Sequence, residues 1–454
     1  MKQQISALLA FSAVVFAPAL YAQADIFGLI QGESARPVIA VPDLRGNGSA
    51  QPVMETFNRT LFADLQDAGV FRMAPKSMYP LEIPQRPQEF RSPLNGERQG
   101  PWLTDWSNPP VGANYVTIGY TAVQDNRLVL FGWLYNVQQP DLSNAQVIGK
   151  LYFADVSQDG ARKLAHDFAA DILRKFGVEP VMGTKIYYTS TRSGNREIWS
   201  MEWDGSNKKQ LTQLRAITNF AAVSPDSTRL AFTTYAKGTP QIMMMSLESG
   251  RILPFYNQQA SLNGTPAFSP DGRLLFSSTA HVSAGRAGSA NVYECNLDGS
   301  GLRRIAMSSA IEMEAKVNPK NGNEIVVTSG RSGPPQIYKM NRDGTDVVRL
   351  TPGEGDAVNP SWHPNGQHIA FAWTRGYDPG NFNIFVMDIA TRQVVQLTRG
   401  AGRNENPSWA PDGRHIVFSS SRNGSVQIWT MLADGTQLRQ LTHEGRNSNP
   451  VWSR

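Results

Sequence analysis

Few side chains in this sequence have the types and spacing that a catalytic or metal site requires. The 454 residues include six histidines and a single cysteine, Cys295. One cysteine excludes a disulfide within the chain and a metal site built on several thiolates. The sequence contains no G-x-S-x-G elbow, no Gly-Lys-Ser/Thr phosphate loop and no H-E-x-x-H pair. These absences favour a binding protein over an enzyme and give no reason to expect a cofactor.

Histidines and Asp-Gly pairs are the remaining candidates for ligand chemistry. His363, His368 and His415 occupy equivalent places in a repeated pattern, and we expect them to be surface or turn histidines. The Asp-Gly pairs lack the closely spaced D-x-[DN]-x-[DN]-G set of a calcium loop. Between alternating strands, Asp-Gly instead predicts a tight hairpin whose two central residues both have positive φ. Neither group predicts a metal site.

One set of positions recurs with regular spacing, each immediately before a proline or at the equivalent place. Three of the six members are asparagines. Asn before Pro commonly initiates a turn, which is one interpretation of the pattern. The other interpretation is a ring of side chains that contacts a partner, and the two are compatible. The six positions are Phe220, Thr265, Glu314, Asn359, Asn406 and Asn449.

These positions belong to a repeat that fills the C-terminal part of the chain. Each repeat has a strand that ends near the proline, a second strand with period-two alternation, a third strand, an Asp-Gly turn and a last strand ending in Leu-Thr. Four short strands in about 45 residues are typical of one β-propeller blade. The marker prolines stand at spacings of 45, 49, 45 and 47 residues: Pro225, Pro270, Pro319, Pro364 and Pro411.

The two ends of the repeat array are offset in a way that predicts a closed ring. The array opens with a second strand at 185–188 that has no first strand before it, and it ends with an isolated first strand at 449–453. Pairing of these segments completes a sixth blade and removes exposed sheet edges. We therefore predict a six-bladed β-propeller over 181–454, closed by the C-terminal strand, rather than an open solenoid or sandwich.

The repeat register also assigns several side chains to the core. Cys295 falls at the inward strand position that other repeats fill with methionine, so we expect a buried thiol rather than a redox or ligand role. The Trp and Phe residues of the first strands are expected to pack between blades. A ligand-stacking ring is the alternative for these aromatic residues.

The N-terminal part has a different organisation. Residues 1–24 carry a charge at Lys2, a short apolar run and an A-x-A pattern, which is typical of a secretory signal peptide; a membrane anchor is the alternative. Residues 25–180 show helical spacing near 54–65 and 164–176 and several apolar strands, which predicts an α/β domain. The proline-rich segment 74–110 is expected to be a long loop.

Composition places broad limits on partners. Hydrophobic residues make up 41% and charged residues 18% of the chain, as in ordinary globular proteins. A net charge of +5 over this length is too small to predict binding to nucleic acid. The repeat motif and the predicted export are compatible with a monomer that acts outside the cytoplasm.

Several segments together resemble the TolB family, the periplasmic propeller of the Tol-Pal system. The resemblance covers nearly all of the chain and follows the order secretory signal, α/β domain and six propeller repeats of the Pro-x-Trp-Ser-Pro-Asp-Gly type. The segments that resemble the family are Ser34 to Pro42, Ala68-Gly69-Val70-Phe71, Gly112 to Gly119 and the terminal Pro450-Val451-Trp452-Ser453.

This resemblance implies a non-enzymatic periplasmic adaptor. The propeller mouth is then expected to bind the peptidoglycan-associated lipoprotein Pal, and the mature N-terminus to bind TolA. Both contacts serve outer-membrane integrity and envelope constriction during division, with an indirect association with the outer membrane and peptidoglycan. The chain departs from the family at Leu262-Asn263-Gly264-Thr265 and at Met313-Glu314-Ala315. The implied contacts are Asn263 with the six ring positions at the mouth, and Asp25, Ile26, Phe27, Leu29 and Ile30 in the N-terminal segment.

Two other functions are compatible with a propeller of this kind. A glycan- or peptidoglycan-binding propeller predicts an aromatic platform at the mouth, where only Phe220 is aromatic. A prolyl-oligopeptidase-like enzyme needs a separate hydrolase domain with a serine elbow, and the sequence has neither. Both are therefore weaker hypotheses than the adaptor.

Overall fold

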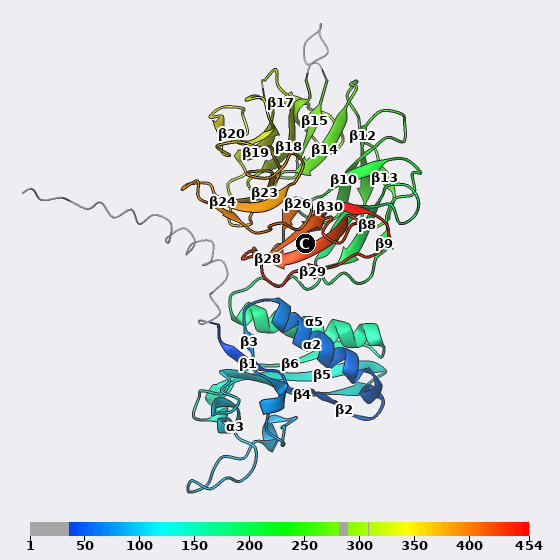
Figure 1. Ribbon diagram of the computed structural model, residues 1–454. Helices are drawn as coiled ribbons and strands as arrows, with labels where there is room; N and C mark the ends of the chain where they lie inside the picture. Colours follow the sequence, from blue (N-terminus) through cyan, green and yellow to red (C-terminus); the bar gives the residue numbers. More distant parts are fainter. Residues whose placement is uncertain (1–35, 281–288, 307, 454) are drawn as a thin grey trace, which may run out of the picture.

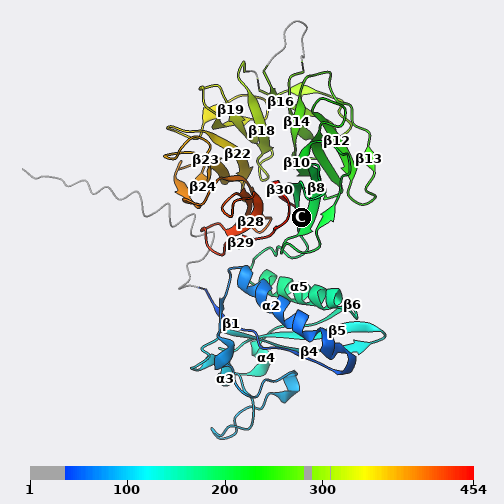
Figure 2. The ribbon, with the colours of Figure 1, turned by 45° about the vertical axis from the view of Figure 1, so that its right-hand side comes forward.

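The computed structural model describes residues 36–280, 289–306 and 308–453. It consists of a sheet with helices near the N-terminus and six four-stranded sheets arranged in a ring. Figure 2 shows the sheets of the ring around a common axis, with the N-terminal part against one side. The predicted signal peptide (1–24) and N-terminal contact segment (25–30) lie outside the described residues.

The N-terminal sheet combines parallel and antiparallel pairs in the order β3-β1-β4-β5-β6, with β2 beside β4. β1 is parallel to both of its neighbours, and β4, β5 and β6 form an antiparallel meander. This matches the predicted α/β domain. The strands are β1 (Val38–Ala40), β2 (Arg45–Gly46), β3 (Arg72–Met73), β4 (Tyr115–Gln124), β5 (Arg127–Asn136) and β6 (Gln146–Asp155).

Two amphipathic helices, α2 (Met54–Asp67) and α5 (Gln158–Lys175), cover one face of this sheet and lie between it and the propeller (Figure 1). Their buried side chains recur every three or four residues, as a helix packed on one face requires. The Ser157 hydroxyl caps α5 by accepting from Gly160 N at 2.9 Å, and Gly177, with φ of 73°, ends it.

The opposite face of the sheet is covered by the proline-rich segment that was predicted to be a loop. Its large side chains Phe90, Leu103 and Trp106 are buried there. The segment therefore acts as a third layer, although it has little regular structure. The short helices of this segment are η3 (Lys76–Met78), η4 (Pro87–Glu89) and α3 (Thr104–Ser107). Elsewhere in the N-terminal region are η2 (Gly48–Val53) and α4 (Leu142–Ala145).

Each propeller blade is an antiparallel sheet of four consecutive strands, except for the blade that contains both ends of the array. The first three blades are β10 (Thr218–Val223), β11 (Arg229–Thr234), β12 (Gln241–Ser246) and β13 (Ile252–Leu253); β14 (Asn263–Phe268), β15 (Leu274–Ser278), β16 (Asn291–Cys295) and β17 (Arg303–Arg304); and β18 (Glu312–Val317), β19 (Glu324–Ser329), β20 (Gln336–Asn341) and β21 (Val348–Arg349). The other three are β22 (Ala357–Trp362), β23 (His368–Trp373), β24 (Asn383–Asp388) and β25 (Val394–Gln396); β26 (Asn404–Trp409), β27 (His415–Ser420), β28 (Gln427–Leu432) and β29 (Arg439–Gln440); and the closing blade, β30 (Asn447–Ser453), β7 (Lys185–Ser190), β8 (Glu197–Glu202) and β9 (Lys209–Gln210).

The closing blade confirms the predicted ring. β30 pairs antiparallel with β7, with Val451 opposite Tyr187 and Trp452 opposite Ile186. The Trp452 indole N–H donates to the Thr184 hydroxyl at 2.8 Å. The two ends of the array therefore share one sheet and leave no open end.

The Leu-Thr ending of the repeats has a structural cause. The fourth strands are short, and after them a threonine hydroxyl accepts the backbone N–H at the second position of the third strand. This hydrogen bond replaces a ladder bond where the fourth strand has left the sheet. It is 2.9 Å long from Ile198 N to Thr212 and 2.8 Å from Ile428 N to Thr442.

The Asp-Gly turns differ in one respect from the prediction. Only the glycine has positive φ, for example 85° at Gly205, whereas Asp204 does not. The Asp204 carboxylate instead accepts from Ser206 N at 2.8 Å. The pair therefore forms an Asp-stabilised turn with a left-handed glycine, rather than a turn in which both residues are left-handed.

Cys295 lies where the repeat register predicts it. It is fully buried and pairs with Leu274 across β15 and β16, in the same way that Met340 pairs with Ile325 in the next blade. Burial raises the pKa of the thiol to about 12. A thiol with this pKa carries almost no thiolate at neutral pH, so core packing is its role.

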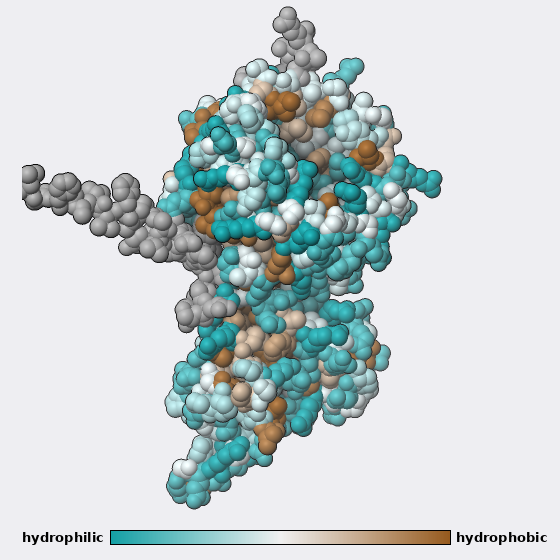
Figure 3. Space-filling model, viewed as in Figure 1, coloured by the Kyte–Doolittle hydropathy of each residue, from teal (hydrophilic) through white to brown (hydrophobic). Residues whose placement is uncertain are grey.

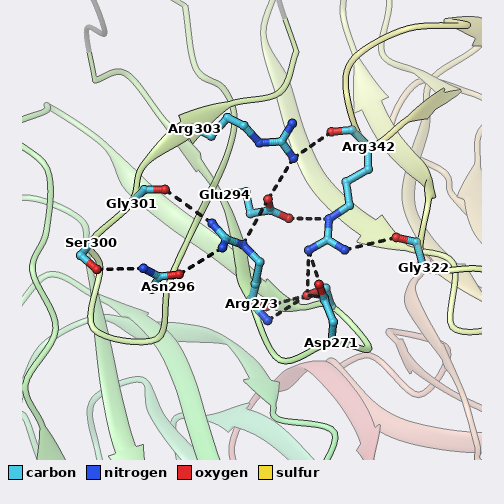
Figure 4. A network of polar contacts seen from close by, with 10 residues as sticks. Asp271, Arg273, Glu294, Asn296, Ser300, Gly301, Arg303, Gly322 and Arg342 are labelled. Carbon is cyan, nitrogen blue, oxygen red and sulfur yellow. Dashed lines mark hydrogen bonds and ion pairs between the residues drawn. The ribbon is translucent and has the colours of Figure 1, made fainter.

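An ion network joins the second and third blades (Figure 4). The Glu294 carboxylate, 3% exposed, accepts from Arg342 at 2.5 Å, from Arg303 at 3.0 Å and lies 3.3 Å from Arg273. Arg342 comes from the neighbouring blade and also pairs with Asp271 at 3.0 Å. One buried carboxylate therefore contacts three guanidinium groups where the two blades meet, and Asp271 adds a second negative charge.

Glu294→Gln is expected to destabilise the protein by about 2–3 kcal/mol, because hydrogen bonds to a charged group are lost and three cations remain. Urea unfolding monitored by circular dichroism measures this change. Glu248→Gln, at an exposed position, is the matched control and should change stability by less than about 0.5 kcal/mol. Equal stability of the two variants would show that Glu294 does not hold the blades together.

Candidate binding site in the propeller channel

The six recurring positions lie together in the centre of the ring. They line one cavity of about 280 Å³ that is formed by the first strands of all six blades. The repeat register therefore predicted correctly that they form a ring. The cavity is lined at these positions by Phe220, Thr265, Glu314, Asn359, Asn406 and Asn449.

Each ring residue sits at a β-bulge inside its strand. All six have φ between 49° and 60°, and the pairing register shifts at this point in every first strand. At the four ring positions that proline follows, the bulge accepts it, because proline has no N–H for the ladder. Asparagine adopts this conformation readily, whereas Phe220, Thr265 and Glu314 are strained in it. The Asn-Pro pairs thus mark bulges within strands, not turns.

Hydrogen bonds connect the ring residues of three consecutive blades. The Glu314 carboxylate accepts from Asn359 N at 2.9 Å and from Asn359 Nδ2 at 2.7 Å. It also accepts from the Thr328 hydroxyl at 2.9 Å. The Asn359 side-chain oxygen in turn accepts from Asn406 N at 3.3 Å. This chain of bonds fixes the side chains before any partner arrives.

Asn263 does not belong to this cavity. Its side chain is 1% exposed, its amide donates to Gln258 O at 2.8 Å, and its oxygen accepts from the Ser278 hydroxyl at 2.7 Å. These bonds hold the loop before β14 to its own blade. Asn263 therefore stabilises the loop that leads into β14 and does not face the channel.

The residues just before the first strands form a rim that was missed in the sequence. Three residues before each ring position, consecutive blades carry Ile217, Leu262 and Ile311. Ile217 is 46% and Ile311 57% exposed. On the other half of the ring, the same position carries Asp356, Arg403 and Arg446. The rim therefore has an apolar half and a charged half. An alignment of the six repeats on the ring position would have revealed this division from the sequence.

The prediction of surface or turn histidines is wrong as to the surface, because His363, His368 and His415 are only 4–5% exposed. His363 does begin a turn, in which Gly366 N donates to His363 O at 2.9 Å. His363 Nδ1 accepts from Asn365 N at 2.9 Å, so its other nitrogen is the donor to Gly413 O at 2.8 Å. Burial lowers its pKa to about 4. His363 is therefore a neutral imidazole that joins two blades.

His415 has the opposite protonation state. Its Nδ1 faces the Asp412 carboxylate at 2.6 Å and its Nε2 faces the Asp67 carbonyl at 2.9 Å. Both partners are acceptors, so both ring nitrogens must donate. Burial opposes the charge, but the Asp412 carboxylate outweighs it and raises the pKa of His415. His415 is thus a cation at the negative end of α2.

Other propeller side chains bind the same helix end. Arg414 donates to Gly69 O at 2.7 Å, and Arg439 pairs with the Asp67 carboxylate at 2.9 Å. The last carbonyls of α2 have no partner within the helix, so these donors complete its C-terminus. The N-terminal region is therefore held at the fifth blade, at the strand ends away from the ring residues.

Neither metal nor membrane features emerge from the described structure. Within residues 36–280, 289–306 and 308–453, no group of three or more His, Cys, Asp or Glu side chains is arranged to hold a metal ion. No helix in those ranges has the length and apolar character to cross a bilayer. Hydrophobic residues form separate patches on a largely hydrophilic surface in the view of Figure 3.

Six four-stranded blades, closed by the last strand and preceded by a mixed α/β region, define a six-bladed β-propeller with an N-terminal domain. The model of the TolB beta propeller domain family (PD40) matches residues 197–376 and 353–454, more than half of the chain. The chain therefore belongs to the TolB beta-propeller family, as the sequence motifs predicted.

Individual relatives agree with this assignment. The protein TolB homolog of Chlorobium luteolum is 30% identical over 277 residues, which cover 61% of this chain and 58% of that protein. The Tol-Pal system protein TolB of Anaeromyxobacter dehalogenans is 30% identical over 182 residues, 40% of this chain and 39% of that protein. The matches thus span less than two thirds of these relatives.

The solved structure of TolB from Acinetobacter baumannii has the same fold. It superposes with a TM-score of 0.72 at 22% identity, over 92% of this chain and 96% of that one. The similarity therefore includes the N-terminal region as well as the propeller.

Proposed function

We propose that this protein is a non-enzymatic periplasmic adaptor of the Tol-Pal system. Its channel mouth binds the lipoprotein Pal, and its N-terminal segment binds TolA. In this way it couples envelope layers, supports outer-membrane integrity and assists constriction during division. The observation that carries the proposal is the ring of six left-handed residues around one cavity. Three of the six, Phe220, Thr265 and Glu314, are strained in this conformation, and strained residues cluster at functional sites on rigid scaffolds.

The rim supports a protein partner. Ile217 and Ile311 are exposed at the mouth, where no fold requirement places them. A hydrophobic arc next to a polar arc is the usual composition of a protein interface, with apolar anchors and charged residues that set orientation. The mouth thus offers an apolar side and a charged side to one partner.

The three tryptophans of the cavity, which Phe220 and Phe268 also line, do not favour a glycan ligand. Trp362, Trp409 and Trp452 are 5–7% exposed and pack between blades. Trp362 and Trp452 use their indole N–H groups within the protein, on Lys316 O and Thr184 Oγ1. A sugar platform needs an open ring face, and these rings are covered.

The test is binding of residues 25–454 to the periplasmic domain of the Pal homologue from the same genome, measured by calorimetry. Replacing Asn359, Asn406 and Asn449 together by lysine is expected to weaken binding more than about 30-fold, the loss of a hot spot of 2 kcal/mol. Asn126→Lys with Asn207→Lys is the matched control, because both residues are left-handed and exposed elsewhere. Undiminished binding by the triple variant contradicts the proposed surface. Retention on purified peptidoglycan without Pal favours the glycan hypothesis.

The TolA contact has a separate test, because its segment lies outside the described residues. Asp25, Ile26, Phe27, Leu29 and Ile30 are mostly apolar and suit addition to the edge of a partner's sheet. A chain that begins at residue 31 is expected to lose TolA binding and keep Pal binding. Equal binding of TolA by both chains contradicts this assignment.

A further inference from the structure

A second layer of side chains lies in the channel, two residues beyond each ring position. The strand pairing places Lys316 opposite Val326, Ser361 opposite Ala370 and Ser408 opposite Val417. These three polar residues stand on consecutive blades and line the same cavity as the ring. The equivalent positions on the other blades are apolar: Ala222, Ala267 and Val451.

Lys316 brings an unpaired cation into the cavity. Among the described residues, no carboxylate lies within ion-pair distance of its ammonium and no acceptor is bonded to it. Burial in the channel lowers the pKa of Lys316, and the Glu314 carboxylate opposes this shift. Glu314 is itself bonded to Asn359 and Thr328 rather than to the lysine.

Other polar side chains that line the same cavity as Lys316 have hydrogen-bond donors left over. The Ser361 oxygen already accepts from Trp409 N at 3.3 Å, and the Ser408 oxygen accepts from Trp452 N at 3.1 Å. Their hydroxyl protons thus remain to be donated. The Asn406 oxygen accepts from the Ser419 hydroxyl at 3.0 Å, which leaves the Asn406 amide N–H₂ as a donor.

We propose that this layer of the channel binds a single carboxylate, held by the Lys316 ammonium and the hydroxyls of Ser361 and Ser408. A carboxylate accepts several such bonds at once, and a charged donor makes the strongest of them. The Lys316 ammonium carries one positive charge, part of which the Glu314 carboxylate offsets, so the layer suits a singly charged ligand better than a phosphate dianion. The inference rests on the proposed function, because the docked lipoprotein would supply the carboxylate.

Acetate is the probe that tests the site without any partner. The lysines of the full mature chain are labelled by ¹³C-dimethylation and observed by NMR. The dimethyl resonance of Lys316 is the one that is missing from the spectrum of Lys316→Met, and it is called the Lys316 signal. Acetate is expected to shift this signal saturably, whereas acetamide, of the same shape without the charge, leaves it in place. Lys320→Met, at a nearby exposed lysine, is the matched control and keeps the response. An equal response to acetamide, or a larger one to inorganic phosphate, overturns the inference.

Two peptides distinguish the sources of the carboxylate. One carries an aspartate side chain between blocked ends, and the other has a free C-terminal carboxylate and no acidic side chain. The peptide that shifts the Lys316 signal at the lower concentration identifies the source, and failure of both overturns the inference.

Binding of the Pal homologue separates this inference from the proposed function. Lys316→Met is expected to weaken binding at least tenfold, while Lys320→Met does not. Urea unfolding of Lys316→Met confirms that the fold is kept. Full-strength binding by Lys316→Met overturns the carboxylate site and leaves the adaptor function intact. No binding by the unchanged protein contradicts the adaptor function, and the acetate titration still tests the site.

Discussion

Truncation after Arg446 is expected to abolish the native propeller, because it removes β30, the strand that closes the ring. β30 pairs with β7 from Asn447 opposite Ser190 to Ser453 opposite Lys185. Without it, β7 becomes an open edge at the channel, and the closing blade loses its contact with the fifth. We expect the truncated chain to lose its near-ultraviolet circular dichroism and its cooperative urea transition. A native-like transition in this chain would show that closure does not hold the ring.

A single substitution tests the same contact in a graded way. Trp452 is 6% exposed and packs in the core shared by the closing and fifth blades. Trp452→Ala is expected to cost about 3–5 kcal/mol, the usual loss for a large buried aromatic side chain. Tyr256→Ala, at a residue 66% exposed, should cost less than about 0.5 kcal/mol. Similar losses in the two variants contradict the role given to Trp452.

His415→Ala is expected to destabilise the protein by about 3–5 kcal/mol. His415 and Asp412 form a buried ion pair, and removing one partner leaves the other charge uncompensated. The substitution also removes the donor to the Asp67 carbonyl at the end of α2, so the N-terminal region should become easier to detach. Urea unfolding measures the first effect, and proteolysis rates within 177–184 measure the second.

The stabilising effect of His415 is expected to depend on pH. Its folded pKa is raised, so its contribution is fully present below the unfolded value of about 6.5 and is lost as pH rises through the folded value. The stability difference between the unchanged protein and His415→Ala should therefore be larger at pH 6 than at pH 9. His443→Ala, at an exposed histidine, is the control. A difference that grows with pH contradicts the cationic assignment.

The architecture could be predicted from the sequence because a propeller repeats its register. Equivalent positions in each repeat lie at equal distances from the axis. The regular repeat spacing was therefore enough to predict that Phe220 and Asn449 lie in one ring, and both line the same cavity. The unmatched strands at the two ends then required closure. Cys295 could be placed in the core by the same argument.

Other features depend on contacts that no local pattern contains. The sequence predicts a surface or turn histidine at position 415, because its partner, the Asp67 carbonyl, is 348 residues away in the chain. The left-handed backbone at Glu314 could not be inferred from an Asn-Pro pattern that this blade lacks. Phe90 and Trp106 cover the sheet from a segment with no periodicity, which is why that segment was predicted to be only a loop.

Site-specific crosslinking measures most directly whether the channel mouth is the docking surface. A photo-crosslinking residue is placed at Asn406, which lines the cavity, or at Asn207, which lies in the groove beside the N-terminal region. Each variant is irradiated with the purified periplasmic domain of the Pal homologue. We expect a crosslinked complex from position 406 and none from 207. A crosslink from 207 alone, or from neither position while binding persists, would contradict a partner seated on the ring.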